Sequence, residues 1–282
     1  MAMAVRPLGD ALGAEVTGLD LGAGPDAPTV AALRDAFLEH HLLCFRAEPL
    51  PARAFAALAR CFGEPKPQLH EHLRHPDEPA VSILDTTYRT PADKPEDLRL
   101  VSISGWHTDD SYFAEPAKAT MLQALELPEG GSETRFANTR AAYDDLPPAE
   151  RRRLDGLSAV HVYDAPRWVG SDRKRTPEER AQTPDVVHPL VRTHDETGAR
   201  AIYYNGNRID RIVGLARDES DALLDEIGAH LTRPKYRYDH SWQPGDLLLW
   251  DNRCLIHAVD VDYPVGQRRL HQRLLLAGTK PV

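Results

Sequence analysis

A dense succession of short strand-like segments fills the chain from residue 98 onward, and this feature constrains the fold most. Each segment is apolar or alternates apolar and polar residues over a few positions, and Gly, Pro, Asp and Asn separate it from the next. Many short strands in sequence predict an all-β barrel or sandwich. The expected strands cover residues 98–103, 119–125, 133–137, 159–163, 187–193, 201–204, 235–239, 246–250, 254–259 and 270–277.

Helical periodicity is confined to a few segments, which we expect to pack on the outside of the strands. The first part of the chain has an α+β character, with two short strands within 5–21 and a buried strand at 42–45. The segment 65–95 is rich in Pro, His and Asp, so we expect a long functional loop there with one strand at 80–84. The polar segment 164–185 is interpreted as an insertion. The expected helices cover 27–40, 51–62, 139–145, 148–154 and 220–231.

Composition excludes several classes of protein. The formal net charge is −9 and the pI is about 5.8. The sequence therefore lacks the basic character that a nucleic-acid partner requires. No apolar run approaches the roughly 20 residues of a membrane span. The three cysteines, Cys44, Cys61 and Cys254, have no C-x-x-C spacing, and no signal segment opens the sequence. Without repeats or low-complexity linkers, residues 1–282 are expected to form one domain in the cytoplasm.

Three H-x-[D/E] triplets occur in the sequence, and they are the first candidates for chemistry. With 13 His and 43 acidic residues, about two such triplets arise by composition alone. The triplet at 75–77 lies in the Pro-rich loop and the one at 194–196 in a turn. His107-Thr-Asp109 alone follows a predicted strand. On an extended segment its imidazole and carboxylate share one face.

A third metal ligand is available in the late strand 254–259, at His257. Two histidines and one carboxylate on one face of an octahedron suit non-haem iron(II) oxygenases. Without further context, His107 and Asp109 are also consistent with a hydrogen-bonded surface pair. His257, flanked by Leu255 and Ile256, is also consistent with an ordinary core histidine.

Two arginines follow at strand spacing. Arg269 and Arg273 are four residues apart on the predicted strand 270–277 or at its edge, so they share a face. At about 3.3 Å per residue they are roughly 13 Å apart and can address two separate anions. The alternative is a solvated edge strand, with the leucines at 270, 274 and 276 as its core side.

Several stretches, in the same order along nearly the whole chain, resemble the TauD/TfdA family, which includes taurine dioxygenase and the 2,4-dichlorophenoxyacetate dioxygenase. The resemblance implies a double-stranded β-helix, the cupin-like jelly-roll barrel, mainly β with flanking helices. The stretches are Pro7 to Leu21, Gly105 to Phe113, Pro128 to Thr134, Thr139 to Leu146, His188 to His194 and Gly245 to Arg253.

The resemblance also implies roles for individual residues. His107, Asp109 and His257 correspond to the iron ligands. Thr134 and Arg269 correspond to the pair that holds the distal carboxylate of the cosubstrate 2-oxoglutarate. Arg273 matches the arginine that meets the anionic group of the prime substrate. A bidentate arginine is the preferred clamp for a carboxylate, which agrees with these roles.

The implied reaction uses Fe(II), 2-oxoglutarate and O2 to hydroxylate a small anionic substrate, with release of succinate and CO2. The expected substrate is a sulfonate, a sulfate ester or an aryloxy or alkyl carboxylate, and natural-product tailoring by the same chemistry is the alternative. Because Asp109 is present where related halogenases have a small residue, we expect hydroxylation. The resemblance further implies a homo-oligomer, a dimer or a tetramer.

Departures from the taurine dioxygenase pattern argue against taurine as the substrate. Ile103 stands where that enzyme has an Asn four positions before its first iron ligand. Its His-Pro-x-Tyr stretch is replaced by 70–75, where His70 and His72 are either substrate contacts or ordinary loop residues. Trp106, Tyr112 and Trp168 either shape an apolar pocket or pack elsewhere.

Two other classes of function would account for only part of this pattern. A metal-dependent hydrolase or isomerase on a cupin-like barrel, with zinc or manganese, would leave Arg269 and Thr134 without a task. A non-catalytic barrel that binds an anion through Arg269 and Arg273 would leave the three metal-ligand candidates unexplained.

Overall fold

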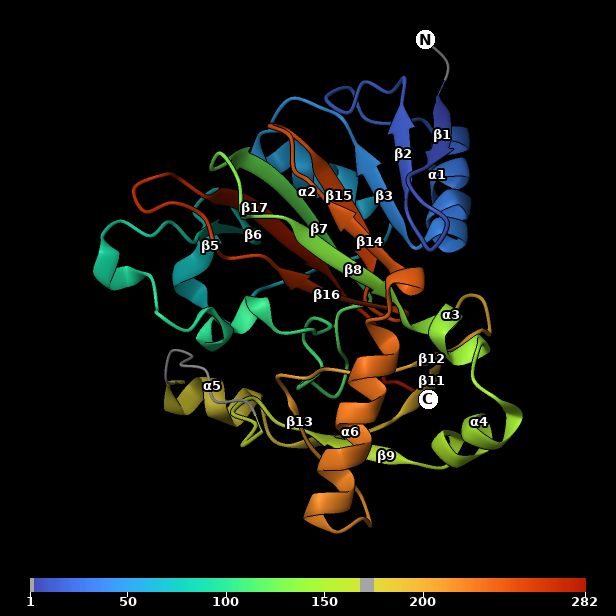
Figure 1. Cartoon of the computed structure of the whole chain (residues 1–282). Helices are drawn as coiled ribbons and strands as arrows, with labels where there is room; N and C mark the ends of the chain where they lie inside the picture. Colours follow the sequence, from blue (N-terminus) through green and yellow to red (C-terminus); the bar gives the residue numbers. More distant parts are fainter. Residues whose placement is uncertain (1–2, 168–174) are drawn as a thin grey trace.

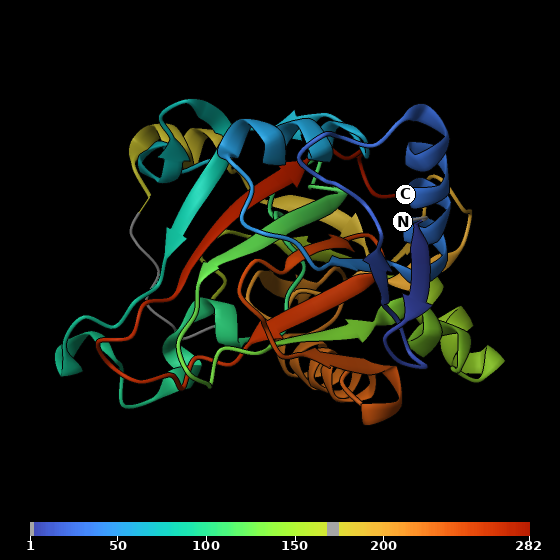
Figure 2. The same cartoon turned by 90° about the horizontal axis from the view of Figure 1, so that it is seen from above.

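The computed structural model describes residues 3–167 and 175–282. Its largest element is a mixed sheet that crosses the molecule (Figures 1 and 2), and the expected mainly β architecture with flanking helices is confirmed. In spatial order this sheet contains β1 (Ala4–Pro7), β2 (Ala14–Thr17), β3 (Leu42–Phe45), β15 (Leu247–Asp251), β7 (Ala119–Glu126), β17 (Leu270–Leu276), β6 (Glu78–Asp85) and β5 (Arg74–His75), with β4 (Pro65–Lys66) paired to β17.

Two helices cover the outer face of the main sheet: α1 (Ala27–His40) and α2 (Ala52–Arg60). The side chain of Asp26 caps α1 by accepting a hydrogen bond from the Thr29 amide at 3.0 Å. Phe37 and Phe55 pack from the helices against strand residues such as Leu249. This apolar layer fixes which face of each strand points away from the helices.

A smaller sheet, β14 (Arg237–His240), β8 (Thr134–Asn138) and β16 (Leu255–Val259), faces the main sheet. All its pairs are antiparallel, and His257 of β16 lies opposite Phe136 of β8. Phe136, Leu122 and Trp250 belong to one buried cluster between the two sheets. Two facing sheets with a shared apolar core form the sandwich of a jelly roll.

The remaining elements lie at one end of this sandwich, where α6 crosses in front in Figure 1. The aliphatic face of α6 packs in a cluster with residues of the short strands, for example Leu224 against Ile212. These elements are α3 (Thr139–Asp144), α4 (Pro148–Asp155), β9 (Ser158–His161), α5 (Pro177–Gln182), β10 (Val186–Pro189), β11 (Val191–Thr193), β12 (Arg200–Ile202), β13 (Ile209–Ile212), α6 (Arg217–Leu231) and the 3-10 turn η5 (Pro234–Tyr236).

The prediction of a strand at 98–103 is wrong. The segment forms two 3-10 turns, η3 (Leu98–Leu100) and η4 (Ser102–Ser104). The Asp97 side chain accepts a hydrogen bond from the Arg99 amide at 3.0 Å, and the Ser104 hydroxyl donates to the Val101 carbonyl at 2.8 Å. Such side chain to backbone bonds favour tight turns over an extended strand.

Three further expectations need correction. The predicted strand 187–193 is interrupted after Pro189 and forms β10 and β11 in different sheets. The expected loop 65–95 contains β4, β5 and a β6 longer than predicted, with the 3-10 turns η1 (Glu71–Leu73) and η2 (Pro91–Asp93). The insertion 164–185 contains α5, and its residues 168–174 lie outside the described part of the chain.

Among the residues that the structure describes, no helix has both the length and the apolar character to cross a membrane. All three cysteines are free thiols, and Cys44 and Cys254 are buried.

Candidate active site

The backbone places His107 beside His257 at the edge of the smaller sheet. The two residues form an isolated antiparallel bridge, in which each amide donates to the other carbonyl at 2.9 and 2.7 Å. Their rings lie 4.2 Å apart between centroids. Although His107 follows a 3-10 turn and not the predicted strand, this bridge keeps it extended locally, and Asp109 follows two residues later.

The three predicted ligands converge on one point. The Nε2 atom of His107 lies 4.0 Å from Oδ1 of Asp109. The Nε2 atom of His257 lies 4.0 Å from Oδ2 of the same carboxylate. One ligand atom from each of the three residues lies within 4.8 Å of the others. Separations of this size fit three donors around a single metal ion, since N and O ligands each lie about 2 Å from such an ion.

Burial sets the protonation that a metal site needs. It lowers the pKa of His257 to about 3, and it also lowers the pKa of His107, so both imidazoles are neutral. Burial opposes ionisation of Asp109, but the electrostatic interactions of the carboxyl with His257 and with the Arg273 guanidinium outweigh it and leave its pKa below the usual value. Neutral imidazoles and an ionised carboxylate are the forms that bind metal.

Hydrogen bonds to neighbouring residues orient the side chains of His107 and Asp109. His107 donates from Nδ1 to the Gly105 carbonyl at 2.7 Å, which leaves Nε2 directed at Asp109. Thr120 on β7 donates to Oδ2 of Asp109 at 2.6 Å, and Asn252 in turn donates to the Thr120 hydroxyl at 2.8 Å. Partners of this kind fix the tautomer and rotamer of metal ligands.

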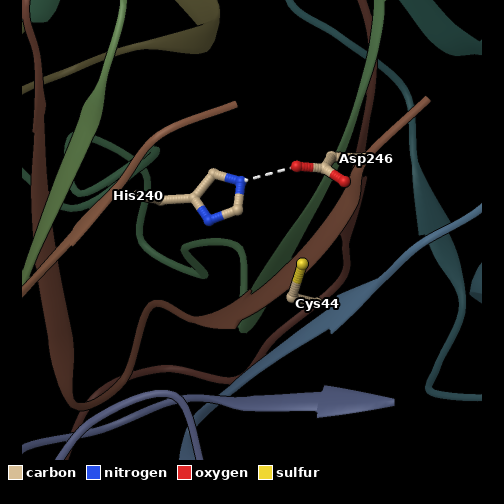
Figure 3. Close-up of side chains that lie close together, drawn as sticks. All are labelled: Cys44, His240 and Asp246. Atoms are coloured by element: carbon tan, nitrogen blue, oxygen red, sulfur yellow. Dashed lines mark hydrogen bonds and ion pairs between the residues drawn. The ribbon is translucent and has the colours of Figure 1, made fainter. Parts of the chain in front are cut away.

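Two other clusters contain metal-ligand residue types, but their groups are already engaged. In the cluster of Cys44, His240 and Asp246, the Asp246 carboxylate pairs with His240 at 3.1 Å (Figure 3). The same carboxylate pairs with Arg46 at 2.5 Å. Burial raises the pKa of the Cys44 thiol to about 12, so it remains protonated.

In the second cluster, of His194, Asp251 and Cys254, the Asp251 carboxylate accepts from His194 at 3.0 Å and from Arg253 at 2.6 Å. Both clusters therefore have the contacts of internal salt bridges. The Asp109 carboxylate is not neutralised in this way, because its contact with Arg273, from Nη1 to Oδ1, is 3.9 Å long.

Arg269 is a buried cation without a carboxylate partner among the described residues. Its Nη1 donates to the Thr86 hydroxyl at 3.0 Å, and its Nε has no partner. Burial lowers its pKa, which reflects the cost of holding a guanidinium away from water. A buried charge of this kind is suited to an anionic ligand.

Thr134, the first residue of β8, approaches the same interior from the smaller sheet. Its hydroxyl accepts a hydrogen bond from the Trp242 indole at 3.0 Å. The Trp242 ring also lies 5.0 Å from the ring of His271, which is two residues from Arg269 on β17. Trp242 therefore links Thr134 to the strand that carries the arginines.

Arg273 lies on β17 beside Asp109 and lines a cavity of about 320 Å3 together with His107 and Asp109. Its Nη2 donates to Oε1 of Gln68 at 2.6 Å. The volume is at the lower end of the range for small-molecule sites. The cavity also exposes apolar and aromatic side chains, among them Leu69, Leu73, Ile103, Tyr112 and Tyr163.

His70 and His72 of the Pro-rich segment both line this cavity. His70 contacts Oε1 of Glu179 through Nδ1 and the Tyr163 hydroxyl through Nε2, each at 3.0 Å. His72 is exposed, with its ring 5.8 Å from that of His70. His70 thus connects the first loop to the α5 segment at the cavity wall.

The three aromatic residues that could shape an apolar pocket do not all lie at the cavity. Tyr112 lines the cavity with its ring 4.9 Å from that of Tyr163. Trp106 instead packs at the apolar cluster of α6, with the Arg135 guanidinium 5.6 Å from its ring centroid. Trp168 lies outside the described residues.

Sequence reasoning missed Tyr163 and Arg208, which also line the cavity. The Arg208 guanidinium lies 4.6 Å from the centroid of the Tyr163 ring and donates to the Tyr163 carbonyl. Tyr163 follows β9, and Arg208 precedes β13. No local motif marks either residue, because only the pairing of β9 with β13 brings them together.

Comparison with known proteins identifies the family of the chain. A family model described as "Taurine catabolism dioxygenase TauD, TfdA family" matches residues 4–275. An alkylsulfatase of Acinetobacter baylyi is 32% identical, over 97% of this chain and 84% of its own. An alpha-ketoglutarate-dependent sulfate ester dioxygenase of Pseudomonas putida is 33% identical, over 99% and 90%. A 2,4-dichlorophenoxyacetate dioxygenase of a Burkholderia strain is 34% identical, over 85% and 82%.

Solved structures are similar to the chain over nearly its whole length. A taurine dioxygenase from Burkholderia xenovorans superposes with a TM-score of 0.82 and 31% identity, covering 99% of this chain and 92% of that one. The enzyme AAD-2, solved with Mn(II) and N-oxalylglycine, has a TM-score of 0.83 and 27% identity, covering 100% and 99%.

Proposed function

Because the chain belongs to the TauD/TfdA family of dioxygenases, we propose that its iron(II) is held by His107, Asp109 and His257, and that Thr134 and Arg269 bind 2-oxoglutarate. The chain is an iron(II)- and 2-oxoglutarate-dependent dioxygenase on a jelly-roll fold. The convergence of three ligand atoms within 4.8 Å is the observation that supports the metal assignment most strongly.

When bound, iron(II) supplies the activation of O2, which couples decarboxylation of 2-oxoglutarate to succinate and CO2 with conversion of a substrate C–H bond to C–OH. The chain's own residues orient the reactants. His107 and His257 are neutral donors, and Asp109 supplies the negative charge. Arg269 and Thr134 would receive the distal carboxylate from opposite sheets.

Arg273 is proposed to bind the anionic group of the prime substrate. It lies at the cavity and close to the metal ligands, so a substrate anchored there would present a neighbouring carbon to the reaction centre. The apolar and aromatic walls at Ile103 and Tyr112 favour a substrate with a hydrophobic body and one anionic end. His70 and His72 are proposed to contact the same substrate.

The substrate class follows from this shape. We propose a sulfate ester, sulfonate, or aryloxy or alkyl carboxylate, and the names of the relatives include an alkylsulfatase and a 2,4-dichlorophenoxyacetate dioxygenase. Natural-product tailoring remains the alternative, because a pentalenolactone F synthase of Streptomyces arenae is 33% identical. A hydrolase or isomerase would leave the buried Arg269 without a role.

We also propose that residues 1–282 form a single dioxygenase domain, supported by the continuous family match over 4–275. A cytoplasmic location and the lack of nucleic-acid or membrane partners are further proposals, supported by the sequence composition. Self-association as a dimer or tetramer is proposed from the family resemblance.

The first test is anaerobic visible absorption of the metal-free protein on addition of iron(II) and then 2-oxoglutarate. A weak charge-transfer band that requires both additions is expected, because the keto acid must chelate the iron. A candidate substrate that shifts the band is bound beside the metal. A protein that holds zinc tightly and gives no band would contradict the proposed site.

Replacing Arg273 by alanine is expected to raise the KM for the prime substrate roughly 10- to 100-fold, because the substrate anion loses its charged partner. The KM for 2-oxoglutarate should change little. Steady-state kinetics with a substrate identified by the band shift measure both constants. An unchanged substrate KM would place the substrate anion elsewhere.

A further inference from the structure

One more polar side chain lies on the strand that carries the two arginines. Side chains alternate along β17, so His271 and Arg273 point to the same side, about 6.6 Å apart along the strand. Arg269 immediately precedes β17, and its carbonyl accepts a hydrogen bond from the Thr86 amide, so the same alternation extends to it. The opposite side belongs to the core under the helices, where Leu274 and Leu276 are buried. His271 therefore lies between the arginines, in the interior between the two sheets.

His271 is fully buried, and neither of its ring nitrogens has a hydrogen-bond partner in the described part of the chain. The rings of His271 and Trp242 pack in a T-shaped arrangement, with an interplanar angle of 78°. The same Trp242 donates to the hydroxyl of Thr134. Buried polar atoms are rarely left unpaired, and in a binding site the missing partner is often the ligand.

His271 lies where 2-oxoglutarate would pass if it bound the proposed metal site at one end and Arg269 at the other. Arg273 marks the metal end of β17, with Nη1 3.9 Å from Asp109, and Arg269 marks the far end. A five-carbon keto diacid that joins the metal to Arg269 and Thr134 must run past the residue between them.

We propose that His271 is a third binding residue for the distal carboxylate of 2-oxoglutarate, donating a ring N–H to one carboxylate oxygen beside Arg269 and Thr134. This inference rests on the proposed function. It assigns His271 a role in selecting a keto acid with a second carboxylate over one without it.

A neutral imidazole suits this role. Burial and the nearby charge of Arg269 lower the pKa of His271 well below its usual value. The ring therefore offers one N–H donor without adding a second positive charge to a buried site. Replacement by an apolar residue removes the donor, whereas glutamine retains an N–H.

The test measures binding to the Mn(II)-loaded protein by calorimetry, with 2-oxoglutarate and with pyruvate, which lacks the distal carboxylate. His271→Leu is expected to weaken 2-oxoglutarate binding about tenfold or more and to change pyruvate binding by less than about twofold. His271→Gln should recover part of the loss. His161→Leu is the matched control, because His161 is equally buried with both ring nitrogens unpartnered but lies on β9, and it should bind both ligands as the wild type does.

Equal weakening of both ligands in His271→Leu would indicate a packing role and overturn the inference, as would unchanged binding of 2-oxoglutarate. His271→Met provides a second apolar replacement with a flexible side chain if the leucine variant is unstable. Failure of the wild-type protein itself to bind 2-oxoglutarate would instead overturn the proposed function, so the two failures are distinguishable.

Discussion

Replacing Asp109 by asparagine is expected to weaken divalent metal binding by at least roughly 10²-fold and to abolish turnover. The carboxylate carries the only negative charge among the three ligands, and loss even of a hydrogen-bond partner behind a ligand costs about 10- to 100-fold in affinity. The variant should still fold. Asparagine keeps the volume of the side chain and can accept the bond that Thr120 donates.

The neighbouring carboxylate provides a matched control. Asp110 points to Lys66, with Oδ2 3.1 Å from Nζ, and its backbone φ of 59° is one that asparagine tolerates. Asp110→Asn should therefore keep wild-type metal affinity. Equilibrium dialysis with Mn(II) or Co(II) measures both variants without relying on activity. Equal affinities for the two variants would show that Asp109 is not a metal ligand.

Strand periodicity predicts which candidate side chains share a face, whereas their roles come from the family resemblance. The i, i+2 spacing of His107 and Asp109 and the i, i+4 spacing of Arg269 and Arg273 each predict a shared face, and the structure has both pairs on one side of the backbone. The shared face of His107 and Asp109 does not depend on a strand at 98–103, because only the residues after the 3-10 turns need to be extended. Thr134 carries no local signal and was named only through the family resemblance.

The parts that sequence could not predict depend on contacts between distant segments. Tyr163 and Arg208 meet at the cavity because β9 pairs with β13, and β13 is too short to be recognised from its own residues. The sequence analysis did not single out His271, because its complete burial and the lack of partners for its ring nitrogens among the described residues depend on the fold around it, including the position of Trp242 after β14. Register between strands, not composition, determines these contacts.

Replacing Arg269 by methionine is expected to raise the KM for 2-oxoglutarate roughly 10²-fold or more, with a much smaller effect on the KM for the prime substrate. Removing one partner of a buried charge pair costs about 2–5 kcal/mol, because the ligand carboxylate is left desolvated without its counter-charge. Arg268→Met is the matched control. Its guanidinium is half exposed and pairs with Glu126 at 2.7 Å, so its loss should leave both constants unchanged.

The same substitution should stabilise the protein when no ligand is bound. In the free protein, Arg269 is a buried cation whose described contacts are hydroxyl and aromatic groups, and replacing an uncompensated buried charge by a well-packed apolar side chain is often stabilising. A gain of about 1 kcal/mol would raise the melting temperature by roughly 2–4 °C in a chain of this size.

Thermal melts can therefore separate binding from folding at Arg269. With Mn(II) present, saturating 2-oxoglutarate should raise the melting temperature of the wild type, because a ligand that binds only the folded state stabilises it. In Arg269→Met the baseline should be higher and the shift on adding 2-oxoglutarate small. A variant that melts lower and still responds fully to 2-oxoglutarate would mean that Arg269 supports the fold and that another group binds the carboxylate. A higher baseline melting temperature with little response to 2-oxoglutarate would show that the burial of Arg269 costs stability and that the residue serves ligand binding.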